Sequence, residues 1–130
     1  MKIERLITNI CSDHLSQSRD FYVTLFDMEV GYDSDWFVNL LSKDKRFEIG
    51  IIRRTHEIVP VDYQANPQGF YLTFTVEDVD KLHEVILEKG FPLLEAPHDT
   101  FYGQRRMLVK DPDGTLVDIS SPIKGFSFSS

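Results

Sequence analysis

Hydrophobic positions along the chain first alternate as in a strand and then recur as in a helix, and this change happens twice. Segment 3–11 is rich in β-branched residues, which predicts a first strand. Ser12 and Asp13 follow it and can cap a helix, because a short side-chain oxygen accepts from the free N–H groups of a first turn. From Leu15 to Phe26 the apolar residues recur at roughly helical spacing, which predicts an amphipathic helix. Three strands are expected after it, at 28–32, 36–42 and 47–53.

The same order of elements begins again after segment 55–68, which holds two prolines and has no clean period. Segment 70–76 predicts a strand, and Asp78 can cap a helix that Gly90 ends, because glycine readily takes the left-handed conformation. Asp13 and Asp78 lie 65 positions apart (78 − 13), which is half of the chain. This offset predicts an internal repeat.

The second half ends in a predicted β-hairpin. Two short runs of apolar and β-branched residues, 105–109 and 116–119, flank the sequence Asp-Pro-Asp-Gly at 111–114. Pro112 sets φ for the first central position of a turn, and Gly114 accepts the positive φ that follows. We therefore expect an α+β fold of two βαβββ modules, with paired curved mixed sheets around a concave pocket. The expected single domain comprises module 1 (1–54), a linker (55–68), module 2 (69–120) and a tail (121–130).

Length and composition narrow the class of protein. A chain of 130 residues suits one domain, and no apolar run approaches the roughly 18–20 residues of a membrane span, so no membrane partner is expected. Glu4 and Arg5 interrupt what would be the apolar core of a signal peptide. Cys11 is the single cysteine and cannot form an internal disulfide, which indicates a reducing compartment; we expect a cytoplasmic protein.

The charge balance bears on partners. The net charge is −7 and the basic residues are scattered, whereas binding to nucleic acid needs clustered Lys and Arg. No nucleic-acid partner is therefore expected. The acidic balance mildly favours neutral or cationic small ligands, although a charged surface that keeps the protein in solution explains it equally simply.

Two motifs resemble those of the vicinal oxygen chelate superfamily, which includes glyoxalase I, extradiol dioxygenases, fosfomycin-resistance enzymes and bleomycin-resistance proteins. One is Tyr-Gly-Gln-Arg at 102–105 followed by Asp-Pro-Asp-Gly, which resembles the closing hairpin of that superfamily. The other is the helix segment 18–22, which ends in Phe-Tyr. The spacing is most similar to the bleomycin-resistance and uncharacterised glyoxalase-like branch, and the resemblance covers 3–119. It implies a homodimer, to which the tail around Phe126 and Phe128 would add apolar contact area.

The resemblance also implies where a metal would bind, namely at four equivalent strand positions that usually carry His and Glu. These positions fall here on Leu6 or Ile7, Glu48, Phe70 or Tyr71, and Asp118. Two carboxylates without a histidine make a weak transition-metal site. We therefore expect no resident metal, or at most a loosely held divalent ion. The four histidines, His14, His56, His83 and His98, are expected at the surface, and His98 is placed in a loop that borders the pocket in relatives.

The remaining candidates for ligand contact are aromatic and charged. They are Trp36, Glu48, Tyr71, Tyr102, Arg105 and Asp118. Arg105 matches the arginine of the family motif, and its main expected role is to hold the loop or a carboxylate such as Asp118. The carboxylates Glu48 and Asp118 are expected to face the pocket from equivalent strands, where pairing with Arg105 or Arg106 is the simpler explanation for both.

Three functions compete. The first is a metal-independent small-molecule binding protein similar to the bleomycin-resistance branch, which holds a drug or metabolite in the cleft. The alternative is a glyoxalase-like lyase or isomerase, or a dioxygenase, that uses a divalent metal at a degenerate site or Glu48 as a general base. The third is an interaction protein whose pocket has no ligand. Whether the protein is an enzyme stays open at this point, since one scaffold of this kind supports both binding and catalysis.

Overall fold

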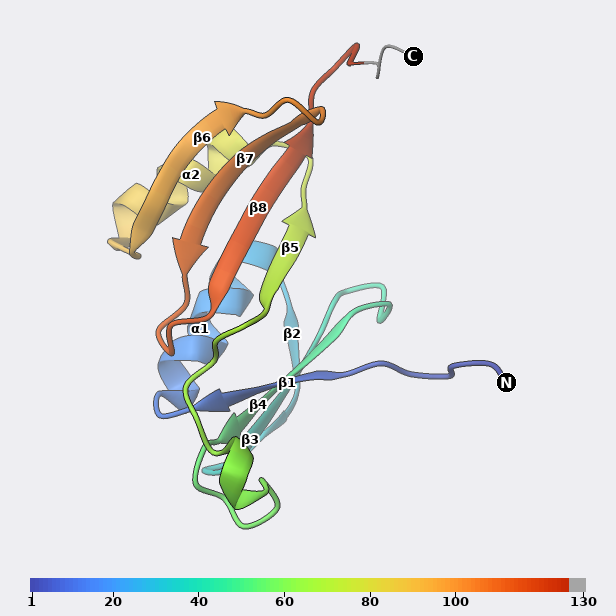
Figure 1. The fold of residues 1–130 in the computed structure, drawn as a ribbon, viewed down its shortest axis with the longest axis vertical. Helices are drawn as coiled ribbons and strands as arrows, with labels where there is room; N and C mark the ends of the chain where they lie inside the picture. The colour runs from blue at the N-terminus through green and yellow to red at the C-terminus, as the bar shows by residue number, and fades with distance from the viewer. Residues whose placement is uncertain (127–130) are drawn as a thin grey trace. The chain divides into compact units, whose positions relative to one another are not determined.

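A computed structural model describes residues 1–126 of the chain (Figure 1). The chain divides into two compact units, Met1–Pro67 and Gln68–Ser130. The first contains β1 (Thr8–Ser12), α1 (Leu15–Phe26), β2 (Glu29–Asp33), β3 (Phe37–Leu41), β4 (Glu48–Arg53) and the short 3₁₀ helix η1 (Val61–Tyr63). The second contains β5 (Tyr71–Thr75), α2 (Val79–Lys89), β6 (Leu93–Asp99), β7 (Gln104–Lys110) and β8 (Leu116–Pro122).

The two units share one topology. The strand order is β1-β4-β3-β2 in the first sheet and β5-β8-β7-β6 in the second. In each sheet the first strand runs parallel to the last, and the other pairs are antiparallel. This confirms the predicted α+β repeat of βαβββ modules.

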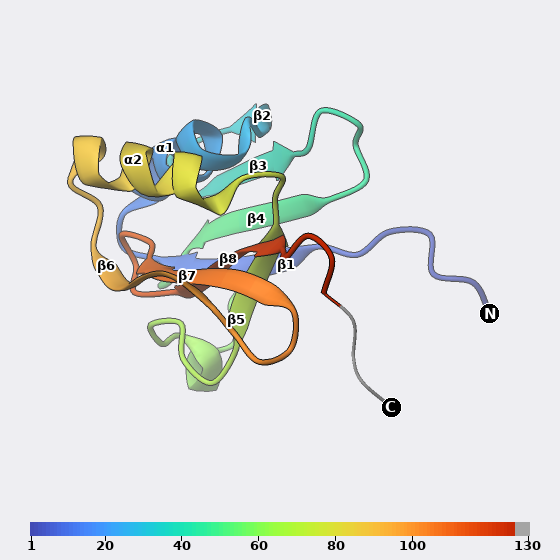
Figure 2. The ribbon, with the colours of Figure 1, turned by 90° about the horizontal axis from the view of Figure 1, so that it is seen from above.

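Each helix packs on one face of the sheet in its own unit (Figure 2). In the first unit the buried face of the sheet comprises Ile10, Val38, Leu40, Ile49 and Ile51, and the buried aromatic residues of α1 are Phe21 and Tyr22. In the second unit the corresponding residues are Met107, Val109, Val117 and Ile119 in the sheet, with Val79 and Ile86 in α2. Because side chains alternate along a strand, the residues between these project from the opposite face. We call that opposite face the open face of each sheet.

Helix ends follow the sequence in α2 and differ from the prediction in α1. The Asp78 side chain accepts from Lys81 N at 3.3 Å, and Gly90 ends α2 with φ of 71°, as predicted. In α1 the cap position is His14, and no side chain caps it. The expected cap by Ser12 or Asp13 is wrong, because the Ser12 hydroxyl instead accepts from His14 N at 2.9 Å, one step before the helix begins.

Two strand boundaries also differ from the prediction. β1 begins at Thr8 rather than at residue 3, since its partner β4 begins only at Glu48 and pairs from Thr8↔Ile49 onward. The segment before it is exposed, including Leu6 at 77%. His98 lies within β6, opposite Arg106 of β7, and not in the predicted loop, because pairing with β7 extends β6 to Asp99.

The closing hairpin forms as predicted. Gly114 N donates to Asp111 O at 3.0 Å across the turn, and Gly114 has φ of 89°. The Asp111 carboxylate also accepts from the backbone N–H of Thr115 at 2.8 Å. β8 continues to Pro122, so the first two residues of the expected tail belong to the sheet. Phe126 packs over Gly103, and Phe128 lies outside the described residues. Within residues 1–126 no helix is long and apolar enough to span a bilayer.

Candidate functional site

Glu48 projects from the open face of the first sheet. It alternates with Ile49, whose side chain is buried on the face that α1 covers. The carboxylate accepts from Asn39 Nδ2 at 2.6 Å and from Arg5 Nε at 2.8 Å, and a second guanidinium nitrogen of Arg5 pairs with it as well. The Glu48 side chain is only 8% exposed.

This environment determines the charge state of Glu48. The hydrogen bond from Arg5 lowers the pKa of the Glu48 carboxyl below its usual value, and Asn39 adds to that effect while desolvation opposes it. The side chain is therefore a carboxylate that already has partners. A carboxylate with a lowered pKa is a weak general base.

Asp118 lies on the open face of the second sheet, in β8, the strand that corresponds to β4, and it is buried at 5% exposure. Its Oδ2 accepts from Thr73 Oγ1 at 3.0 Å, and its Oδ1 accepts from Ser120 Oγ at 2.6 Å. Arg106 Nε lies 3.5 Å from Oδ1, which is an ion-pair distance and not a hydrogen bond. Both carboxylates therefore lie on the open faces of their own sheets, as the predicted strand register requires.

Arg105 and Arg106 are adjacent in sequence and point to opposite faces of β7. Arg105 faces α2, where Nε and Nη2 donate to Asp80 at 2.9 and 3.1 Å and Nη1 donates to Asp99 at 3.1 Å. These bonds lower the pKa of the Asp80 carboxyl and raise the pKa of Arg105. The carboxylates that Arg105 holds are thus Asp80 and Asp99; the expected pairing with Asp118 is wrong, because alternation directs Arg106 and not Arg105 to that face.

Of the three aromatic candidates, only Tyr71 shares an open face with a carboxylate of its own sheet. Trp36 precedes β3 and stacks on His56 with ring centroids 4.2 Å apart, at the end of the β3–β4 ladder away from Glu48. Tyr71 begins β5 on the open face and is 52% exposed. Tyr102 lies before β7 at the other end of the second sheet, where its ring meets Phe101 edge-on.

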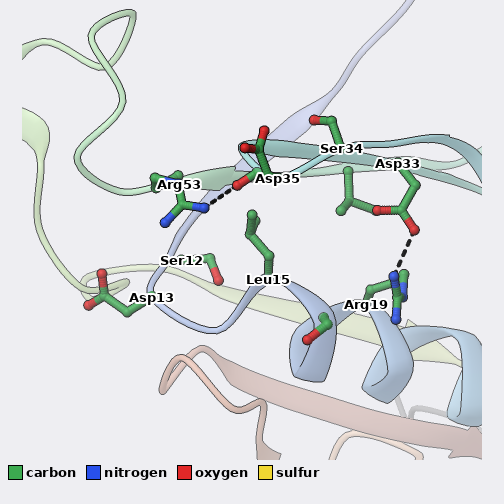
Figure 3. Close-up of a pocket in the computed structure, with 10 residues that line it drawn as sticks. Ser12, Asp13, Leu15, Arg19, Asp33, Ser34, Asp35 and Arg53 are labelled. Atoms are coloured by element: carbon green, nitrogen blue, oxygen red, sulfur yellow. Dashed lines mark hydrogen bonds and ion pairs between the residues drawn. The ribbon is translucent and has the colours of Figure 1, made fainter.

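A pocket of about 280 Å³ lies on the helix side of the first unit, where α1 begins (Figure 3). Its lining consists of Ser12, Asp13, Leu15, Ser16, Arg19, Asp33, Ser34, Asp35, Val38 and Arg53. Two arginines of the lining have partners within it: Arg19 Nη1 donates to the Asp33 carboxylate at 2.7 Å, and Arg53 donates to the backbone oxygen of Asp35 (Figure 3). Sequence reasoning missed this hollow, because the segment 33–35 reads only as a polar turn.

The donor set of the open faces does not suit a resident transition metal. Each open face offers one carboxylate at a family metal position, and each carboxylate lies beside an arginine that already offsets its charge. The other two positions carry Leu6 or Ile7 and Phe70 or Tyr71, which supply no imidazole. Within residues 1–126 no three His, Cys, Asp or Glu side chains cluster closely enough to hold a metal ion.

Comparison with known proteins agrees with this fold. The family model of the glyoxalase/bleomycin resistance protein/dioxygenase superfamily matches residues 6–119. A family enzyme from Burkholderia phytofirmans is 25% identical with a TM-score of 0.76, and the match covers 90% of this chain and 97% of that one. A search of curated proteins found no match.

Two further structures carry more specific descriptions, and at their level of identity they show the fold alone. TnmS3, an antibiotic binding protein from Streptomyces sp. CB03234, is 18% identical with a TM-score of 0.73, covering 94% of this chain and 98% of that one. Lactoylglutathione lyase from Agrobacterium tumefaciens is 18% identical with a TM-score of 0.69, covering 96% and 98%. With the family model matching most of its length, the chain belongs to the glyoxalase/bleomycin resistance protein/dioxygenase superfamily.

Proposed function

We propose that the protein binds a small molecule without a metal, as a binding protein of this superfamily. The observation that carries the proposal is the state of the two carboxylates at the family metal positions. Glu48 accepts from Arg5 and Asn39, and Asp118 accepts from Thr73 and Ser120. A metal would have to displace these partners, and a charge already offset by its own chain attracts a cation weakly.

The alternative, a lyase or isomerase with Glu48 as general base, has less support. Removal of a proton next to a carbonyl needs a base whose pKa lies near the working pH. Arg5 lowers the pKa of Glu48 instead. The likeness to a structure described as lactoylglutathione lyase, at 18% identity, supports the shared fold and not a shared reaction.

The likeness to TnmS3, described as an antibiotic binding protein, is compatible with the binding proposal. It establishes that this fold can serve binding, and it says nothing about the ligand here. Aromatic surface is available on the second open face, because Tyr71 is half exposed there. Aromatic and apolar walls with a few placed polar groups are typical of small-molecule sites.

Two measurements on purified protein test the proposal together. Elemental analysis should find far less than one equivalent of Zn, Ni, Fe or Mn per chain, and a thermal-shift screen of small molecules should find saturable stabilisation that EDTA leaves unchanged. About one equivalent of metal, lost in Glu48→Ala, would contradict the proposal and favour the lyase.

The homodimer expected from the resemblance stays a prediction. Light scattering should report about twice the 15.1 kDa mass of one chain. A species of single-chain mass at micromolar concentration would contradict it.

A further inference from the structure

Arg106 lies on the second open face, and N–H groups of its guanidinium make no hydrogen bond within residues 68–126. Its Nε is buried, yet it makes no hydrogen bond. Its side chain is 23% exposed, so that exposure belongs to other atoms of the side chain. The guanidinium donates to no described side chain or backbone oxygen of its own unit, residues 68–126, and its contact with Asp118 is an ion pair at 3.5 Å. A guanidinium carries five N–H donors in a planar fork.

Asp118 does not take up this donor capacity in the structure, since Arg106 Nε lies 3.5 Å from its Oδ1. Each of its oxygens already accepts from a hydroxyl, Thr73 on one side and Ser120 on the other. The adjacent Arg105 shows the opposite arrangement, with three hydrogen bonds to two carboxylates. Arg105 therefore holds β7 to its neighbours, whereas Arg106 is positioned without a full set of partners.

The groups that share the open face with Arg106 indicate which kind of ligand could bind beside its guanidinium. Gln104, two residues earlier on β7, has a buried Oε1 without a hydrogen-bond partner. Leu108, two residues later, is buried at 9% exposure, and the half-exposed Tyr71 of β5 lies level with Lys110, about 13 Å along the strands from Arg106. The surface near Arg106 thus combines a cation with free donors and one free acceptor.

We propose that the ligand of this protein is a small molecule that bears an oxyanion, which Arg106 binds. This inference rests on the proposed binding function and names the ligand class. Oxygens of a carboxylate, phosphonate or sulfonate match the guanidinium fork, and charge-assisted bonds of this kind are among the strongest that a side chain makes. The net charge of −7 opposes an anion only at long range, where salt screens it, while Arg106 acts at contact distance.

Matched fluorinated probes test the ligand class directly. Binding of 4-fluorobenzoate and 4-fluorophenylphosphonate is measured by ¹⁹F NMR titration beside the neutral 4-fluorobenzamide. Wild-type protein should bind the two anions more tightly than the amide, and Arg106→Gln should weaken anion binding roughly 10- to 100-fold, which corresponds to the loss of a charge-assisted hydrogen bond.

Two further variants distinguish a direct contact between Arg106 and the anion from the general effect of removing a positive charge. Lys110→Gln removes the same charge from an exposed residue of the same strand, about 13 Å along β7, and should change anion binding less than twofold. Arg106→Lys keeps the charge but loses the fork, and an intermediate affinity is expected. Arg106→Lys also serves as the folded comparison should Arg106→Gln unfold, as judged by circular dichroism.

The outcomes distinguish the two proposals. Equal binding of the amide and the anions, or equal losses in Arg106→Gln and Lys110→Gln, would overturn the oxyanion class and leave the binding function standing. Unchanged anion binding in both Arg106 variants would do the same. The absence of saturable binding by any of the three probes would overturn the oxyanion class, and only a negative screen of other small molecules as well would overturn the binding function.

Discussion

The open faces of the two sheets hold one carboxylate each and satisfy it by different means. Glu48 in the first unit is held by Arg5, a residue that precedes β1, together with Asn39 of β3. Asp118 in the second unit is held by the hydroxyls of Thr73 in β5 and Ser120 in β8. In the first unit an arginine donates two hydrogen bonds to the carboxylate, while in the second two hydroxyls donate to it and Arg106 makes only an ion pair with it.

The two faces also differ in packing at particular positions. Gly50 of β4 lies under Asn9 and Phe37, and a Cβ built on it would come within 2.2 Å of Asn9 Oδ1. The second face instead leaves Tyr71 half exposed. The lesson of the comparison is that a repeat can keep a carboxylate on the equivalent strand of each sheet while one copy holds it with an arginine and the other with hydroxyls.

The largest expected effect comes from Asp118→Ala. The substitution removes the acceptor of two hydroxyls and leaves Arg106 without its counter-charge, which should cost about 2–3 kcal/mol of unfolding free energy. Urea denaturation measures the loss, and Asp118→Asn, which keeps an acceptor oxygen, should lose less. A cost below about 0.5 kcal/mol for Asp118→Ala would mean that the hydroxyls find other partners, and the contrast with Glu48 would fail.

Gly50→Ala tests the packing of the first open face. The added methyl group would collide with Asn9 and the Phe37 ring, and overpacking of this kind should cost about 1–2 kcal/mol. Thermal unfolding monitors the change. Asn9 Oδ1 is the atom nearest to the added methyl group. Gly50→Ala should therefore lower the melting temperature less when it is introduced into the Asn9→Ala variant than when it is introduced into the wild type. An unchanged melting temperature in Gly50→Ala would show that the first open face can accommodate the added methyl group.

The smallest effect concerns the pH dependence of Glu48. Its pKa is lowered in the folded protein, so the ionised side chain contributes stability above the unfolded pKa, near 4.5, and that contribution disappears as the pH falls through the folded pKa. The difference in melting temperature between wild type and Glu48→Gln should therefore be largest near neutral pH and shrink as the pH falls from about 5 to 3. A difference that grows on acidification would have the wrong sign for an arginine-paired carboxylate.

Strand alternation and helical spacing in the sequence predicted the repeat, the extent of α1 and the closing turn, because each depends on local conformational preference. The predicted strand boundaries were wrong where pairing with a neighbouring strand sets the end of a strand. β1 begins only where β4 offers a partner, and His98 enters β6 because β7 extends that far.

The sequence by itself determined the two βαβββ modules from period, and through the family resemblance it placed Glu48 and Asp118 at metal positions whose other two members lack imidazole. Which charges meet was decided by the tertiary structure. The family motif drew attention to Arg105, but the register of β7 against β8 directs Arg106 toward Asp118 and Arg105 toward Asp80. The alternation that separates the two arginines was readable from the chain. Their partners were not, because Asp80 reaches Arg105 only through the packing of α2, and Asp118 reaches Arg106 only through the pairing of β8 with β7.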